Sequence, residues 1–193
     1  MDKEQIKTTK KYNMIYECQS FYSASKKLIN AISDDLTFSC DTIPCAVNCA
    51  LTCELALKSL YLILGKDYKK THYLDELLFN LPGDYLIYIL YNYWQRYYKN
   101  FDCTFAIDKI FSIAEYFVNI RYLCDYSQVI SLYDIQSFME VVYEMVTANC
   151  KVKISPLSSF TEDCQDANEI NKKFIVAEQD AINKRKSKFI KTK

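Results

Sequence analysis

The chain has 193 residues, and 50% of them are hydrophobic, which is enough for one domain with a sizeable core. Glycine occurs only twice and proline three times, whereas average usage would give roughly a dozen and about ten. Since β-sandwiches and barrels need many tight turns, and nucleotide-binding α/β folds need glycine-rich loops, this scarcity argues against both classes and favours an all-helical protein.

Positive and negative charges balance at 24 each, but they are unevenly distributed. Residues 172–193 carry a net charge of +6 and residues 1–11 a net charge of +2, so residues 12–171 carry −8. A net-acidic body is a poor match to a protein whose whole surface binds nucleic acid, although a basic tail can contact phosphates. Alternatively, the basic residues 172–193 form a solvated segment that binds no partner.

The nine cysteines and the N-terminal residues bear on the compartment. The count is odd and no apolar run near the N-terminus predicts a signal peptide, so we expect free thiols and a cytoplasmic protein. No uninterrupted apolar stretch approaches the ~20 residues of a membrane span. Cys45, Cys49 and Cys53 share one helical face, but no second pair has zinc-motif spacing, so we expect core packing and no metal or other cofactor.

Local signals place the elements along the chain. Thr42 and Pro44 favour a helix start, Gly65 a helix end, and Asp102 an N-cap. With the spacing of apolar residues, they predict helices over residues 10–32, 42–64, 72–80, 85–100, 103–124 and 134–149.

Five or six helices with short connections predict an up-and-down antiparallel bundle. Tyr12 and Tyr16 fall on the apolar stripe of the first helix. Residues 1–154 form the expected domain, and residues 155–193 a polar, basic C-terminal extension. In the tyrosine-rich helix over 85–100 the rings fall on several faces, which favours packing over stacking on bases.

Arg121 is the most informative single residue, because it follows the core stripe of its helix. A guanidinium keeps its charge, so it needs a partner if it is buried. Asp125 and Glu54 are candidate carboxylates, which would make a structural ion pair. The other interpretation is an arginine at the rim of a cleft that binds phosphate.

Glu54 and Lys58 lie four residues apart on one helix and can pair. His72, the only histidine, is expected at the start of a helix, where a capping or packing role is commoner than catalysis. A single histidine also excludes a metal site with several histidine ligands.

Three segments, residues 47–60, 71–77 and 117–122, together resemble the HEPN superfamily of prokaryotic helical bundles. The resemblance rests on Glu54-x-x-x-Lys58, on His72-x-Leu74 and on Arg121-Tyr122. It covers roughly residues 12–150 and implies a four- or five-helix bundle, usually a homodimer. Many members are metal-independent ribonucleases in toxin–antitoxin or other defence systems, and others bind nucleotides or are inactive adaptors.

The resemblance breaks at the catalytic pair. Catalytic members carry an arginine followed four to six residues later by a histidine, and Arg121 matches the arginine while Tyr126 stands near the histidine's place. A tyrosine with a pKa of about 10 is only about 0.1% ionised at neutral pH. The usual proton-transfer pair is therefore absent, although Tyr126 can still donate a hydrogen bond to phosphate.

Three functions remain open from the sequence. The first is an RNA- or nucleotide-binding protein in a defence or toxin–antitoxin setting, with Arg121, Asn48, Glu54, Lys58 and His72 at the ligand and a cognate antitoxin or defence protein as partner. The second is a divergent metal-independent endoribonuclease that uses Arg121 and Tyr126. The third is a non-catalytic protein-interaction module.

Overall fold

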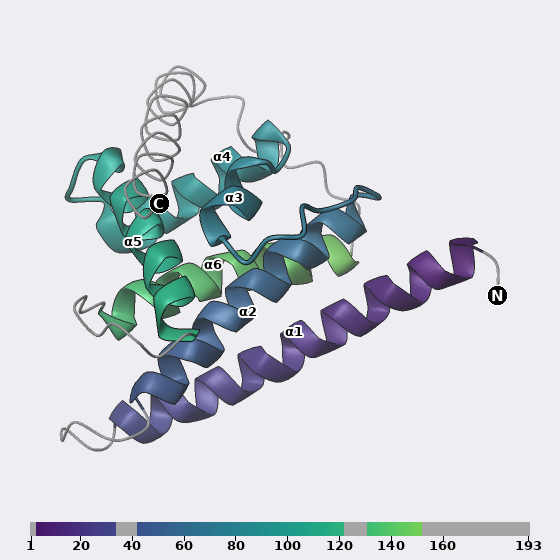
Figure 1. Ribbon diagram of the computed structural model, residues 1–193. Helices are drawn as coiled ribbons and strands as arrows, with labels where there is room; N and C mark the ends of the chain where they lie inside the picture. Colours follow the sequence, from purple (N-terminus) through teal and green to yellow (C-terminus); the bar gives the residue numbers. More distant parts are fainter. Residues whose placement is uncertain (1–2, 34–41, 122–130, 152–193) are drawn as a thin grey trace, which may run out of the picture.

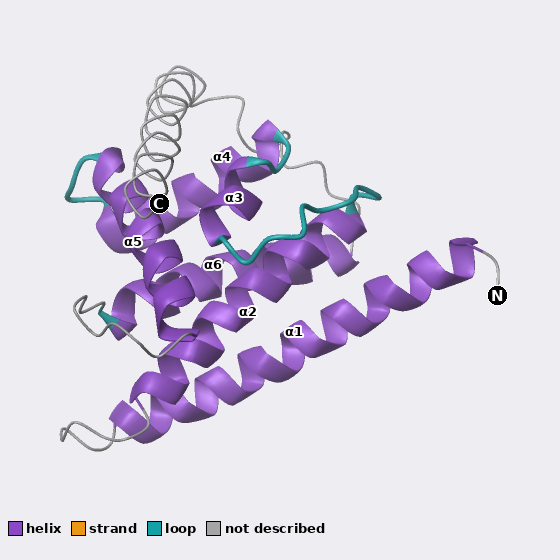
Figure 2. Ribbon diagram, in the orientation of Figure 1, coloured by secondary structure: helices purple, strands orange, loops and turns teal. Residues whose placement is uncertain are grey.

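A computed structural model describes residues 3–33, 42–121 and 131–151 of the chain (Figure 1). These residues form helices joined by short loops, with no strand among them (Figure 2). The elements are α1 (Lys3–Ser33), α2 (Thr42–Ile63), α3 (Leu74–Phe79), α4 (Gly83–Tyr93), the π-helix η1 (Trp94–Tyr98), α5 (Cys103–Arg121) and α6 (Leu132–Lys151). The all-helical prediction is confirmed for this part of the chain.

The long helix α2 lies at the centre, between α1 on one side and α6 with the shorter helices on the other (Figure 1). α1 runs antiparallel to α2, whereas α6 runs along α2 in the same direction. The antiparallel direction predicted for consecutive helices is therefore seen for α1 and α2, and the shared direction of the second and sixth helices, α2 and α6, agrees with an alternating order (Figure 1). α5 contacts α2, α3, α4, η1 and α6.

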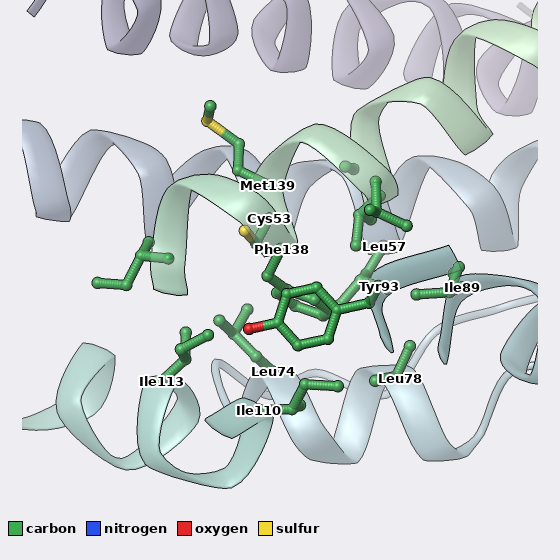
Figure 3. Close-up of a cluster of buried hydrophobic side chains, with 14 of the residues drawn as sticks. Cys53, Leu57, Leu74, Leu78, Ile89, Tyr93, Ile110, Ile113, Phe138 and Met139 are labelled. Carbon is green, nitrogen blue, oxygen red and sulfur yellow. The ribbon is translucent and has the colours of Figure 1, made fainter. Parts of the chain in front are cut away.

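The main core lies between α2 and the helices that follow it. Its largest fully buried side chains are Tyr93, Phe117 and Phe138. The rings of Tyr93 and Phe138 pack edge to face, with their centres 5.5 Å apart (Figure 3). The residues around them come from α2, α3, α4, α5 and α6: Cys53, Leu57, Leu74, Leu78, Ile89, Ile110, Ile113 and Met139. The apolar residues that recur at helical spacing along α6 are all buried: Ile135, Phe138, Met139, Val142, Met145 and Val146.

The two ends that the sequence signalled most clearly are confirmed. Gly65 follows α2 with a φ of 69°, a left-handed conformation that favours glycine. The Asp102 carboxylate accepts a hydrogen bond from the backbone N–H of Thr104 at 3.0 Å and so caps α5.

The expected place of two tyrosines in α1 is wrong. Tyr12 is 65% exposed and Tyr16 71% exposed. α1 packs on α2 through one narrow face that includes the buried residues Cys18, Ser25 and Ile29. At about 100° per residue, Tyr16 points about 160° away from Cys18. Tyr12 and Tyr16 are four residues apart and so share one face of α1, but this face is not the one that packs on α2.

The single helix predicted over residues 85–100 is instead divided. α4 ends at Tyr93 and continues as the π-helix η1, whose wider turn changes the direction of the following side chains. The Tyr98 hydroxyl donates to Asp134 Oδ1 at 2.5 Å, and the Tyr97 hydroxyl donates to Glu140 Oε2 at 2.9 Å. Both carboxylates belong to α6, so these hydrogen bonds hold the π-helix η1 against α6.

Candidate functional site

The carboxylate of Glu54 is the centre of the polar cluster that the structure forms from the predicted residues. The side chain is only 4% exposed and lies midway along α2. Its Oε1 atom is 2.5 Å from Lys58 Nζ and 2.9 Å from His72 Nδ1. The structure thus brings together three of the residues named from the sequence, and the predicted pairing of Glu54 with Lys58 is confirmed.

The path of the chain after α2 explains why His72 reaches Glu54. After Gly65 the loop turns back alongside α2, and the hydroxyl of Tyr61 donates to the carbonyl of Leu77, which fastens α3 to α2. The hydroxyl oxygen of Thr71 accepts from the N–H of Tyr73 at 3.1 Å. His72 lies in this loop, two residues before α3 begins at Leu74, and not within a helix as predicted.

The geometry fixes how His72 is held. A carboxylate only accepts hydrogen bonds, so the imidazole donates from Nδ1 to Glu54. The histidine side chain is 57% exposed, and its second nitrogen, Nε2, is not used in this contact. A carboxylate that orients an imidazole in this way supports proton transfer or hydrogen bonding at the free nitrogen.

Two further residues extend the cluster towards α1. The Lys58 ammonium lies 5.5 Å from the centre of the Tyr68 ring, and the Lys10 ammonium lies 4.8 Å from the same centre. Both are cation–π contacts. Neither Tyr68 nor Lys10 is predicted from the sequence, because only the folded loop brings these distant positions together.

Asn48 is not part of this cluster. Its side-chain amide donates to the backbone carbonyl of Pro44 at 2.8 Å, within α2 itself. Six residues separate it from Glu54, which is about 9 Å along the helix axis and about 120° around it.

The structure places Arg121 only by its backbone. Arg121 is the last residue of α5, a helix in contact with α2. Its side chain, together with Asp125 and Tyr126, lies outside the described residues. Glu54, which was one candidate partner for Arg121, accepts from Lys58 and His72.

The cysteine face of α2 is buried, as the sequence predicted. Cys45, Cys49 and Cys53 are fully covered, and Cys18 of α1 is also buried. Burial raises the pKa of the Cys18 thiol to about 12, which disfavours the thiolate that metals bind. Within the described residues, no group of three or more histidine, cysteine, aspartate or glutamate side chains could hold a metal ion.

A second buried carboxylate was not found from the sequence. Asp134, at the start of α6, accepts from Tyr98 through Oδ1 and from Lys109 through Oδ2 at 2.9 Å. Tyr93 donates to the Asp134 carbonyl at 3.3 Å. These contacts leave the carboxylate well satisfied inside the fold, which is typical of a structural ion pair.

α2 is also the one described helix that is long and apolar enough to cross a membrane. Most of its apolar window, 72%, is buried inside the protein, as in a core helix.

Comparison with protein-family models, with characterised proteins and with solved structures found no match to this chain.

Proposed function

We propose that this chain is a HEPN-like protein that binds RNA or a nucleotide, in a prokaryotic defence or toxin–antitoxin setting. The observation that supports this function best is the convergence of Lys58 and His72 on the buried Glu54 carboxylate, with His72 exposed to solvent. The proposal includes a homodimer, a cognate antitoxin or defence partner, and a cytoplasmic location.

Each residue has a distinct part in the proposed site. Glu54 keeps the His72 ring in one orientation, so its Nε2 atom can contact a phosphate oxygen without a search for the right rotamer. Lys58 supplies fixed positive charge beside it. Arg121 is proposed as the phosphate clamp and Tyr126 as an additional hydrogen-bond donor, whereas Asn48, which the sequence also suggested, lies away from the Glu54 cluster and donates to Pro44.

Ligand titration tests the proposal. A fluorescent nucleotide and a labelled single-stranded RNA are titrated with protein at one fixed salt concentration, and anisotropy is measured. We expect His72→Gln and Arg121→Ala each to weaken binding about tenfold or more, because each removes a charge-assisted or oriented contact. Lys27→Gln, an exposed lysine of α1, is the matched control. Unchanged binding in both site variants would overturn the proposal.

A metal-independent endoribonuclease is the second candidate, and the Glu54–His72 hydrogen bond is the observation that favours it. Carboxylate-oriented imidazoles act as general bases and acids. His72, rather than Tyr126 alone, would then transfer the proton, while Arg121 would stabilise the negative phosphate. RNA incubated with the protein in EDTA should be cleaved, and His72→Gln should reduce the rate about a hundredfold. Intact RNA at high protein concentration would reject this candidate.

A further inference from the structure

The positive charges of the Glu54 cluster extend onto α1. We propose that the ligand carries at least two linked phosphate groups, as in a nucleoside diphosphate or triphosphate, and that Lys10 binds the second phosphate. The inference rests on the proposed function, since it names the ligand class of the same site. Lys10 is an exposed residue on the first third of α1, far in sequence from Lys58 and His72.

The spacing of the basic groups supports more than one phosphate. Lys58 Nζ and His72 Nδ1 share one oxygen of Glu54, so they are at most about 5.4 Å apart. The ammonium groups of Lys10 and Lys58 lie 4.8 and 5.5 Å from the centre of one ring, which limits their separation to about 10 Å. One phosphate fits beside Lys58 and His72, and a second, linked phosphate extends its charge towards Lys10.

The local charge balance points the same way. Lys58 forms an ion pair with Glu54, whereas Lys10 lies against the Tyr68 ring, which the Lys58 ammonium also faces. Within the part of the chain that the structure describes, Lys10 lies against the Tyr68 ring and forms no ion pair, whereas Lys69 pairs with Glu76 at 3.0 Å. Since Lys58 is already paired with a carboxylate, Lys10 is the lysine whose charge a second phosphate would neutralise.

The size of the cluster favours a small ligand over a polynucleotide. A nucleic acid gains affinity by placing many phosphates on an extended basic surface. Here the ammonium groups of Lys10 and Lys58 lie at most about 10 Å apart, and residues 12–171 carry a net charge of −8. A compact polyphosphate concentrates its negative charge where the positive groups are.

Calorimetric titration of the full chain in EDTA tests the inference, with inorganic phosphate, inorganic pyrophosphate, a nucleoside diphosphate and a short single-stranded RNA as probes. We expect pyrophosphate to bind about tenfold or more tightly than phosphate. Lys10→Gln should remove this preference and leave the affinity for phosphate within about twofold. Lys27→Gln, on the same helix, should leave the preference intact, and circular dichroism checks that both variants are folded.

The outcomes separate the two proposals. Equal affinity for phosphate and pyrophosphate, or an unchanged preference in Lys10→Gln, would overturn the inference about Lys10 and leave the proposed function standing. Tighter binding of RNA than of any polyphosphate would also overturn it, while supporting the proposed function. If no phosphate compound and no RNA binds, the proposed function itself is wrong.

Discussion

At the scale of single residues, the protein contains a buried carboxylate that two neighbours contact. Glu54 lies inside the helical bundle, where an unpaired charge would be strongly destabilising. Lys58, which is itself only 11% exposed, forms an ion pair with Glu54, and His72 donates a hydrogen bond to it. Removing one of these partners would leave a buried carboxylate with fewer compensating contacts, which destabilises the folded state.

The ion pair is expected to be sensitive to single substitutions. Lys58→Met should lower the free energy of unfolding by about 3 kcal/mol, because Glu54 stays buried without its lysine. Adding Glu54→Gln to this variant should recover part of the loss, since the uncompensated charge is gone. Urea unfolding of the two single variants and the double variant measures the coupling.

Lys69→Met is the matched control for this cycle. Lys69 pairs with Glu76 on the surface, so its loss should change the free energy of unfolding by under about 1 kcal/mol. Equal effects of the two lysine substitutions would show that the Glu54–Lys58 pair contributes no more than a surface ion pair.

At the scale of elements, the ends of the helices follow local rules. The left-handed backbone at Gly65 ends α2 and directs the loop back towards Glu54. Gly83, by contrast, is the first residue of α4 and has no positive φ, while a Cβ added at either glycine would meet no atom within 4 Å. The two glycines therefore provide a direct comparison of backbone strain.

Gly65→Ala should destabilise the protein by about 1 kcal/mol, because an alanine disfavours a positive φ. Gly83→Ala should be neutral or slightly stabilising, since alanine is the better helix former. Thermal unfolding of the two variants checks both signs. A loss in Gly83→Ala as large as that in Gly65→Ala would contradict this account of the turn.

The hydrogen-bonded tyrosines of the π-helix are expected to make the stability of the protein depend on alkaline pH. Burial, followed by the hydrogen bonds to Asp134 and Glu140, raises the pKa values of Tyr98 and Tyr97 above the ordinary 10.0. Burial alone raises the pKa of Tyr61 to about 12. A tyrosine with a raised folded pKa contributes its full stability below the unfolded pKa and loses it as the pH rises.

The free energy of unfolding should accordingly fall as the pH rises above about 10, in urea titrations at a series of pH values. Tyr97→Phe should make the fall less steep, because phenylalanine does not ionise. A free energy that stays level up to a pH of about 12 would show that these hydroxyls are not held in their neutral form.

At the scale of the whole molecule, α2 organises the fold. It contacts α1, α3, α5 and α6, and its cysteine face is fully covered. Cys18, Cys49 and Cys53 have raised pKa values, to which burial contributes in each case and, for Cys49, a hydrogen bond to Cys45 contributes most. These thiols are consequently expected to report on global unfolding.

Alkylation by iodoacetamide, followed site by site with mass spectrometry, should modify the exposed Cys150 quickly in the native protein. Cys45, Cys49 and Cys53 should react only in denaturant, because all three are buried, and the raised pKa values of Cys49 and Cys53 also disfavour their thiolates. Fast native labelling of the α2 cysteines would show that α1 separates readily from α2.

The sequence by itself determined the helical class, the end of α2 at Gly65, the cap at Asp102 and the pairing of Glu54 with Lys58. Each of these depends on residues close in the chain, where spacing and backbone preference decide the outcome. It could not determine that His72 and Lys10 come to the same place, that the chain forms a π-helix after Tyr93, or that Tyr16 faces solvent. Those features depend on how distant elements pack, and only the tertiary structure fixes which face of each helix is covered.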